Sequence, residues 1–214
     1  MGTNADKTEN GGSAVYLESS CLIIREMHQE DLQQVEAWRP FRDPLYRLWN
    51  IPRSTLLTRD IWFTLYWPDH SRLWYVIERR SDSQVIGTLS LRDIVGHVSA
   101  RLGISLGADF VDQGYGSEAL CLFLPHYFYT LNFGQLFLDV AATNKRAIHV
   151  YKRLGFRQTG CHYRNIPEDQ DLSFLEEEQH RDLRVYFRRH LGRMQLLFYD
   201  MTLERSTWEK QTLG

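Results

Sequence analysis

The apolar residues of the chain change their spacing near its midpoint, and this change restricts the folds that are open to it. Before this point, three strand-like runs follow one another closely, at residues 72–80, 84–94 and 97–106. Short turns separate them, at 81–83 and near 95–96. Three adjacent strands joined by tight turns form an antiparallel meander. We therefore expect this part of the chain to build the antiparallel part of a sheet.

After the meander, helical and strand-like segments alternate. Apolar side chains recur at helical spacing over residues 116–131, where Pro125 should bend or divide the helix because it removes an amide donor. The elements expected next are a strand at 134–141, a helix at 144–154, strands at 155–163 and 194–203, and a short helix at 204–211. This order indicates an α+β (mixed α/β) fold, with a mixed, mostly antiparallel sheet of about seven strands and helices on both faces.

The chain ahead of the meander divides into a polar tail and a short folded segment. Residues 1–20 are expected to form a flexible tail, because the first 14 residues hold too few apolar groups to pack. A strand is predicted at 21–27, followed by a short helix from His28 and a second helix at 58–67. Residues 21–214 are then expected to form a single domain.

The charge and cysteine content argue against several classes of function. With 25 basic and 27 acidic residues the formal net charge is -2, which argues against nucleic-acid binding through bulk charge. No apolar run approaches the ~20 residues that cross a bilayer, and the first residues carry no readable secretion signal. Three widely spaced cysteines indicate neither a disulfide framework nor a metal site. We expect a cytoplasmic protein that binds neither nucleic acid nor membrane, with Cys121 and Cys161 buried.

The segment Val111–Leu120 has the composition of a phosphate-binding loop. Gly114 and Gly116 let the backbone turn tightly and approach a ligand, and the helix that follows begins with free amides at the positive end of its dipole. Such a helix start binds phosphate or pyrophosphate, and Ser117 would add a hydroxyl donor. A plain glycine turn before an amphipathic helix explains the same residues equally well.

The same glycines match a short form of the dinucleotide-binding fingerprint, with Asp139 as its distant acidic residue. That fingerprint requires a strand inside a parallel βαβ unit, whereas here an antiparallel meander comes first. An oxidoreductase that uses a nicotinamide or flavin is therefore a weaker alternative.

A second segment places three chemically distinctive residues on one helix face. Asn144, Ala147 and Tyr151 are spaced i, i+3 and i+7 in the helix expected at 144–154. The small side chain of Ala147 leaves room between the two polar groups. A purely structural interpretation stays open, in which Asn144 caps the helix and Tyr151 packs in the core.

Together the two segments resemble the GNAT superfamily of acyl-CoA-dependent N-acetyltransferases. The phosphate-binding pattern of that family, Arg/Gln-x-x-Gly-x-Gly/Ala, corresponds to residues 111–116. Its later pattern, Asn-x-x-Ala-x-x-x-Tyr followed by Gly-Phe, corresponds to residues 144–156. The order of the expected strands and the separation of the motifs agree as well. The resemblance covers about residues 21–163 and resumes at 194–208, which is similar to the branch of ribosomal-protein N-terminal acetyltransferases.

The resemblance implies a three-layer GNAT-like fold with a site for acetyl-CoA and no metal. The strand ahead of the glycine loop would splay from the next strand, and the pantetheine arm would pair with the backbone of Ile104 and Leu106. Asn144 would hold the pantetheine or contact the bound intermediate, and Tyr151 would be the general acid that protonates the departing thiolate. The pyrophosphate would lie on the loop residues, which are Gln113, Gly114, Tyr115, Gly116 and Ser117.

The implied reaction is direct transfer of an acetyl group from acetyl-CoA to a primary amine through a tetrahedral intermediate. A strand amide between Ile104 and Leu106 would stabilise the oxyanion of that intermediate. A tyrosine with its ordinary pKa of about 10 stays protonated at neutral pH, so Tyr151 would be able to serve as the proton donor.

Two positions depart from the family pattern. Val111 stands where the family has Arg or Gln, and Arg101 stands where relatives often carry a Glu that acts as the general base. A chain of water molecules is one alternative for the role of the base, and the side chains that remain unranked for it are Ser105, His97, Asp93 and Asp139. A non-catalytic acyl-CoA-binding or sensor domain is the second interpretation.

The sequence leaves the acceptor amine open between a small molecule and a protein N-terminus. Tyr46 or Trp49, in the segment 40–50, would form an aromatic wall of the acceptor pocket. The segment 164–193 is an insertion relative to the simple hairpin of the family, and it would cap the acceptor groove, form a homodimer contact or only cover an edge. Its acidic stretch at 168–178 would suit a cationic acceptor, and its basic stretch at 181–193 is compatible with a helix.

Overall fold

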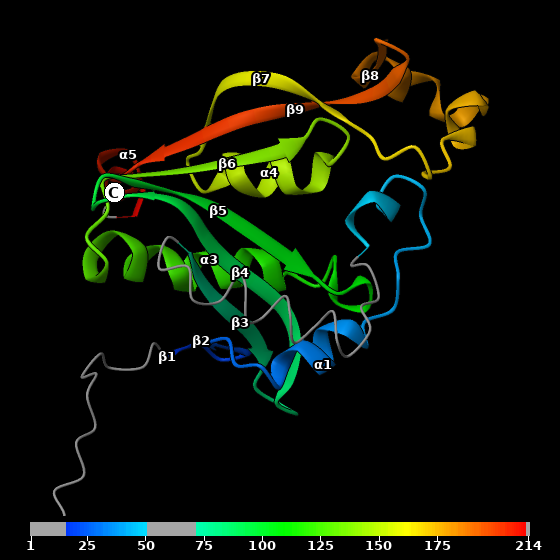
Figure 1. Cartoon of the computed structure of the whole chain (residues 1–214). Coiled ribbons are helices and arrows are strands. Elements are labelled where there is room, and N and C mark those ends of the chain that lie inside the picture. Colours follow the sequence, from blue (N-terminus) through cyan, green and yellow to red (C-terminus); the bar gives the residue numbers. More distant parts are fainter. Residues whose placement is uncertain (1–15, 51–71, 213–214) are drawn as a thin grey trace, which may run out of the picture.

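A single mixed sheet runs through the molecule (Figure 1). The structure is a computed structural model that describes residues 16–50 and 72–212, so the helix expected at 58–67 lies outside the described residues. The sheet has nine strands in the order β1-β2-β3-β4-β5-β6-β9-β7, with β8 paired to β9. The mixed, mostly antiparallel sheet is confirmed, and two short strands, β1 and β8, raise the count above the expected seven or so.

The strands in chain order are β1 Tyr16–Glu18, β2 Leu22–Glu26, β3 Leu73–Arg79, β4 Gln84–Val95, β5 Ser99–Leu106, β6 Gln135–Ala141, β7 Arg157–Asn165, β8 Phe187–His190 and β9 Arg193–Glu204. The α-helices are α1 Asp31–Glu36, α3 Tyr115–Pro125, α4 Lys145–Arg153 and α5 Arg205–Thr212. The short 3-10 or π segments are η1 Arg47–Trp49, η2 Ala108–Phe110, η3 His126–Thr130, η4 Ser173–Glu176 and η5 Glu178–Tyr186. Within the described residues, no helix has the length and apolar character needed to cross a membrane.

Strands β5 and β6 are parallel, and they separate part of the way along their length. Their pairing begins at Ser99 with Gln135 and ends at Arg101 with Phe137. Strand β5 continues to Leu106 and β6 to Ala141, so a gap opens between the second halves of the two strands. This is the splay that the family resemblance implies.

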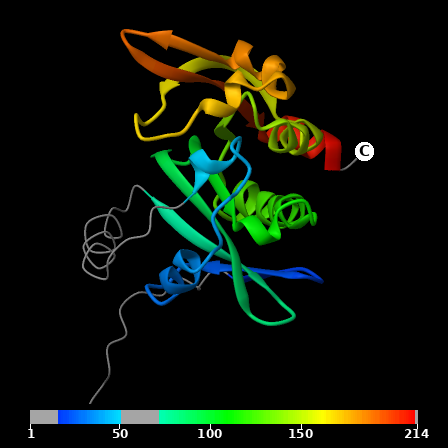
Figure 2. The ribbon, with the colours of Figure 1, turned by 90° about the vertical axis from the view of Figure 1, so that its right-hand side faces the viewer.

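The two faces of the sheet carry different layers. Helices α3, α4 and α5 cover one face, where Leu102, Phe123 and Leu138 belong to the largest apolar cluster. Helix α1 covers part of the opposite face, where Val76 and Val85 pack against it. The view in Figure 2 shows α1 on one side of the sheet and α3 with α4 on the other. The layers confirm the expected helices on both faces.

The expected helix at 116–131 is divided at Pro125, as predicted. Helix α3 ends at this residue, and the next turn, η3, is a π-helix in which the amide of Leu131 donates to the carbonyl of His126 at 2.9 Å. A proline has no amide hydrogen with which to continue an α-helical ladder, and π-turns occur where that ladder is interrupted.

The insertion differs from its sequence prediction. Residues 181–193 do not form an α-helix: the first six belong to the 3-10 helix η5, and Phe187–His190 then pair with β9. Phe187 joins a small apolar cluster that contains Ile166 and Leu196, together with Trp49 from the segment before β3. Strand pairing and this burial outweigh the favourable charge order of a helix.

Two further expectations differ from the structure. Cys121 on α3 and Cys161 on β7 are exposed, as is Cys21 in the bend before β2. Residues Tyr16–Glu18, inside the expected tail, form β1 and pair with β2. An extended segment can pair along an open sheet edge through its backbone, which a polar composition does not prevent.

Candidate active site

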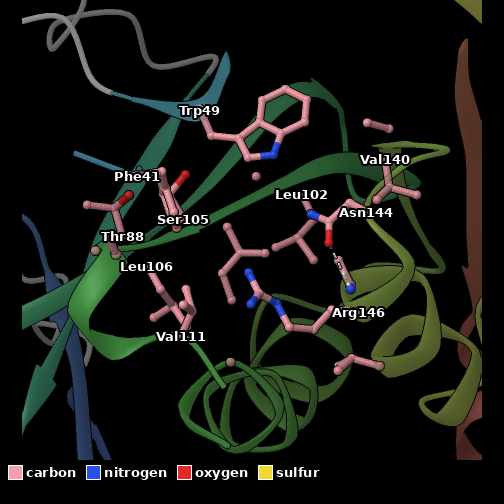
Figure 3. Close-up of a pocket in the computed structure, with 18 of the residues that line it drawn as sticks. Phe41, Trp49, Thr88, Leu102, Ser105, Leu106, Val111, Val140, Asn144 and Arg146 are labelled. Atoms are coloured by element: carbon pink, nitrogen blue, oxygen red, sulfur yellow. Dashed lines mark hydrogen bonds between the residues drawn. The ribbon is translucent and has the colours of Figure 1, made fainter. Parts of the chain in front are cut away.

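A cavity of about 680 Å³ lies where β5 and β6 separate (Figure 3). Its lining comes from β4, β5 and β6, from the glycine loop that opens α3, from α4, and from the segment that contains Trp49. Both segments that carry the family motifs therefore meet at one space. Ligand sites are generally concave spaces of this size with a few polar groups at fixed positions.

The glycine loop forms one end of the cavity. Gly114 has φ +86° and is the N-cap of α3, and the amide of Glu118 donates to its carbonyl at 3.0 Å. The amides of the first helical residues therefore have no partner within the helix. Gly114, Gly116 and Ser117 line the cavity, whereas Gln113 and Tyr115 belong to the same loop but lie outside the lining.

Strand β5 presents a different set of side chains on each face. Leu102, Ile104 and Leu106 face the helical layer that includes α3, and all three line the cavity. Gly103 and Ser105 also line it from the opposite face of the strand. The predicted cosubstrate contacts at Ile104 and Leu106 are thus placed on the stretch of β5 that β6 does not pair with.

Helix α4 brings Asn144, Ala147 and Tyr151 to the same cavity. The Asn144 side chain accepts a hydrogen bond from the amide of Ala147 at 3.1 Å, so it caps the helix as well as facing the cavity. Tyr151 is 8% exposed and packs on Phe156, with ring centroids 5.6 Å apart. The structural interpretation of these residues is therefore confirmed, and their functional role stays a prediction.

The Tyr151 hydroxyl has the properties of a retained proton donor. Burial raises the pKa of Tyr151 well above its ordinary value, and the negative charge of Asp139 raises it further. Among the described residues, the hydroxyl makes no hydrogen bond. The group therefore keeps its proton at neutral pH and is available to a ligand in the cavity.

Asp139 on β6 is a buried carboxylate held by three arginines. Its side chain is 5% exposed, and its oxygens lie 2.7 Å from Nη1 of Arg164, 3.0 Å from Nη1 of Arg101 and 3.5 Å from Nη2 of Arg92. Burial acts to raise the pKa of Asp139, but the hydrogen bond from Arg164 and the charges of the three arginines outweigh it and hold the pKa below its ordinary value. This carboxylate is therefore a poor proton acceptor.

The other side chains considered for the general base are also poorly suited to accept a proton in the cavity. Arg101, at the position where relatives carry Glu, also binds Asp93 at 2.9 Å. The His97 ring contacts the Leu131 carbonyl at 3.2 Å and does not line the cavity. Ser105 lines the cavity but has no basic group. None of the four side chains named from the sequence therefore takes the place of the family glutamate.

Aromatic residues wall the other side of the cavity. Trp49 and Phe41 line it, and Trp49 packs edge-on against Phe198 of β9 at 6.1 Å. Of the two residues expected to form this wall, Trp49 does so, whereas Tyr46 lies outside the lining beneath the guanidinium of Arg146. No residue of the acidic stretch 168–178 lines the cavity, so the expected acidic complement for a cationic acceptor is not found there.

Sequence reasoning missed Arg92, Arg164 and Phe198 as lining residues. A signal for the first was present in the chain, because Thr88, Ser90 and Arg92 alternate with apolar residues along β4 and so mark a polar face. The other two lie on strands far along the sequence, and only the sheet order brings them to the cavity.

The dinucleotide alternative was set aside partly on an expectation that the structure corrects. Strand β5, helix α3 and strand β6 do form a parallel βαβ unit. However, the two strands separate after Arg101, and Asp139 is occupied by arginines rather than open to a ribose. Among the described residues, no group of His, Cys, Asp or Glu side chains is placed to hold a metal ion.

The family assignment follows from a match over residues 22–157 to the profile of the acetyltransferase (GNAT) domain. This match covers more than half of the chain, and the chain therefore belongs to the GNAT acetyltransferase family. It is an acyl-CoA-dependent acetyltransferase with acetyl-CoA as its cosubstrate.

The relatives with similar sequences include spermidine acetyltransferases. The chain is similar to spermidine N(1)-acetyltransferase of Escherichia coli K12, with 25% identity over 138 residues, 64% of this chain and 73% of that protein. It is 23% identical over 143 residues to spermidine N(1)-acetyltransferase of Vibrio cholerae, covering 66% of this chain and 82% of that one.

Solved structures share the fold. A crystal structure of spermidine N-acetyltransferase from Vibrio cholerae in complex with CoA and spermine superposes with a TM-score of 0.64 at 20% identity, covering 89% of this chain and 99% of that one. A dodecameric structure of spermidine N-acetyltransferase from the same organism gives a TM-score of 0.60 at 20% identity, covering 89% and 97%. The similarity to the ribosomal-protein branch stays a prediction.

Proposed function

We propose that this chain transfers the acetyl group of acetyl-CoA to the primary amine of a small molecule. The observation that carries the proposal is that the glycine loop, Asn144 and Tyr151 border one cavity at the separation of β5 and β6. The relatives named above are spermidine acetyltransferases, which supports a small acceptor over a protein N-terminus.

The cosubstrate would bind along the glycine loop and the unpaired stretch of β5. The loop amides at Gly114, Gly116 and Ser117 would hold the pyrophosphate, helped by the positive end of α3. Gln113 and Tyr115 would contribute through backbone amides only. The pantetheine arm would pair with the backbone at Ile104 and Leu106. The Asn144 amide group would contact the same arm from α4.

The transfer needs a neutral amine and a stabilised leaving group. The amine nitrogen forms a bond to the thioester carbon, and the carbonyl electrons move to oxygen, where a strand amide near Ile104 would stabilise the charge. Collapse of the intermediate breaks the carbon–sulfur bond and releases CoA as a thiolate, and the amine proton leaves to solvent. Because the raised pKa of Tyr151 exceeds that of an ordinary thiol, about 8.5, the hydroxyl would stabilise the thiolate mainly by donating a hydrogen bond.

Compartment and assembly are part of the same proposal. The three cysteines are exposed and form no disulfide, which fits a reducing compartment such as the cytoplasm. Residues 21–214 would act as one catalytic domain. A homodimer through the insertion is our expectation, and sedimentation of the full chain measures it.

A pair of tyrosine variants tests the proposal. Tyr151→Phe should lower kcat by about 10²-fold, with little change in thermal stability because the hydroxyl has no partner among the described residues. Tyr127→Phe should lower the thermal stability and leave kcat nearly unchanged. The hydroxyl of Tyr127 donates to the Gln135 carbonyl at 2.6 Å and accepts from the Ala100 amide at 3.0 Å, and the variant loses both hydrogen bonds.

The assay follows CoA release with a panel of small primary amines and N-terminal peptides, beside thermal shifts with acetyl-CoA, CoA and NAD. Stabilisation by acetyl-CoA together with amine-dependent CoA release is the expected result. Stabilisation by acetyl-CoA without release for any amine would indicate the non-catalytic binding domain instead.

A further inference from the structure

The face of the sheet opposite α3 carries a polar strip within the cavity. In the antiparallel register of β4 and β5, Ser90 pairs with Gly103 and Arg92 pairs with Arg101. Paired residues of neighbouring strands project to the same face, and the apolar residues between them face α3. A Cβ at Gly103 would lie 2.6 Å from the Ser90 hydroxyl, so this strip is open only because position 103 has no side chain.

The charge of the cavity lining does not suit a polycation. Its charged members among the described residues are four arginines, Arg39, Arg92, Arg146 and Arg164, and three acidic residues, Glu36, Asp112 and Asp139. Two of these arginines are paired with carboxylates: Arg146 binds Asp112, and Arg39 lies 3.5 Å from Asp109. Of the remaining charged lining residues, Arg92 and Arg164 lie beside Asp139, and Glu36 lies on α1.

Around Asp139, the donors outnumber the acceptors. Three guanidinium groups share two carboxylates, and Arg101 already binds both Asp93 at 2.9 Å and Asp139 at 3.0 Å. Arg164 donates to Asp139 at 2.7 Å and to His162 at 2.9 Å, and it lies on the Phe198 ring at 4.4 Å. Arg101 and Arg164 therefore each make two polar contacts of 3.0 Å or less within the protein.

Arg92 is the exception in this cluster. Within residues 16–50 and 72–212 its one ion pair is the 3.5 Å contact to Asp139, and its side chain is 40% exposed and lines the cavity. A guanidinium has five N–H donors in a fork that matches carboxylate and phosphate oxygens. Most of the hydrogen-bonding capacity of Arg92 is therefore unused by the protein.

A second donor without a partner borders the same space. The indole Nε1 of Trp49 is buried and has no hydrogen-bond partner in the part of the chain that the structure describes. In Figure 3 the nitrogen lies on the side of the ring turned toward Leu102 and Asn144, inside the pocket. This nitrogen is fully enclosed, so Trp49 borders the cavity through its ring, and Arg92 is the donor that is open to a ligand.

We propose that the acceptor amine carries an anionic oxygen group, a carboxylate or a phosphate, which Arg92 binds on the face of the sheet opposite α3. This inference rests on the acetyl-transfer function proposed above and narrows its acceptor class. It sets the chain apart from the polyamine specificity in the names of its relatives. The aromatic wall formed by Trp49 and Phe198 would pack against the carbon skeleton of such an acceptor.

The test compares amines that differ only in the anionic group. The pairs are phenylalanine with phenethylamine and O-phosphoethanolamine with ethanolamine, and spermidine serves as the cationic reference. Binding is measured by calorimetry in the presence of CoA, which cannot donate an acetyl group, and turnover is measured separately as CoA release from acetyl-CoA. The variants are Arg92→Gln, Arg92→Glu and, as a charge-matched control outside the cavity, Arg193→Glu.

The wild-type chain and Arg193→Glu should bind the anionic member of at least one pair at least about tenfold more tightly than the other member. The affinity ratio of the anionic to the uncharged member is compared between the two pairs, and the pair with the larger ratio shows whether the site prefers a carboxylate or a phosphate. This ratio should fall to near one in Arg92→Gln and reverse in Arg92→Glu, with acetyl-CoA affinity retained as the check on folding. A preference for spermidine or for the uncharged partners in the wild type, or a ratio that the Arg92 variants leave unchanged, would overturn the inference. An Arg92-dependent preference without any CoA release would sustain it while refuting the transfer function.

Discussion

Replacing Asp139 with Asn tests whether the buried carboxylate holds the sheet together at the splay. The change keeps the shape of the side chain but removes the charge that faces three arginines at 2.7, 3.0 and 3.5 Å. Breaking one side of a fully buried ion pair costs about 3–5 kcal/mol. Here the arginine side chains are 32–42% exposed, so solvent screens their repulsion and the cost should be smaller. We expect a loss of about 1.5–3 kcal/mol.

For a chain of this size, that loss corresponds to a decrease in Tm of about 3–12 °C. The assay is thermal unfolding followed by circular dichroism, with Asp82→Asn as the control. Asp82 also has a pKa held below its ordinary value, by a hydrogen bond from Arg79, but this pair is solvent-exposed in a turn, and its loss should change Tm little. Equal melting temperatures for the wild type and Asp139→Asn, or equal losses for the two variants, would refute the reasoning.

The same pair of proteins gives a pH dependence with a defined sign. Because the folded pKa of Asp139 lies below the unfolded value of about 3.9, its stabilisation is fully present above that pH. The stabilisation is lost as the pH falls through the lower folded value. The difference in stability between the wild type and Asp139→Asn should therefore stay constant from pH 7 to about pH 5 and shrink below about pH 4. A difference that widens on acidification would contradict the assigned charge state.

Two further predictions concern the cosubstrate site. Gly114 has φ +86°, and Gly114→Ala should raise the KM for acetyl-CoA about tenfold. Gly192, on the β8–β9 turn, has a similar φ of +77°. Gly192→Ala should therefore lower the stability as much as Gly114→Ala does and leave the KM for acetyl-CoA unchanged. Asn144→Ala should remove the cap of α4 and cost about 1 kcal/mol of unfolding free energy. Asn144→Asp should keep this stability, because its carboxylate still accepts the hydrogen bond from the Ala147 amide. It should nevertheless raise the KM for acetyl-CoA, because it has no amide donor for the pantetheine. Chemical unfolding measures the first effect and steady-state kinetics measures the second.

The parts of the fold that sequence predicted correctly are those that depend on local patterns. The β3–β5 meander follows from alternating side chains and short turns, and the end of α3 follows from the chemistry of Pro125. The capping role of Asn144 is local too, since it involves a residue three positions away. Helical spacing was also sufficient to place Tyr151 on the face that lines the cavity.

The parts that sequence missed depend on the order of strands in the sheet. Strand β9 lies between β6 and β7, and this arrangement brings Phe198 and Arg164 to a cavity whose other walls come much earlier in the chain. No local pattern encodes a contact between residues so far apart. The basic stretch 181–193 shows the same limit, because its pairing with β9 overrides a helix-compatible order of charges.

The position of the Trp49 wall has a consequence for how selectivity between acceptor amines would change during evolution. The indole packs against the same buried cluster as Leu172, Tyr186 and Phe187 of the insertion, none of which lines the cavity. A change in the length of that insertion would move the wall while every lining residue stayed the same. Acceptor preference in this branch is therefore open to drift by insertions and deletions, and two chains with identical pocket residues need not share a substrate.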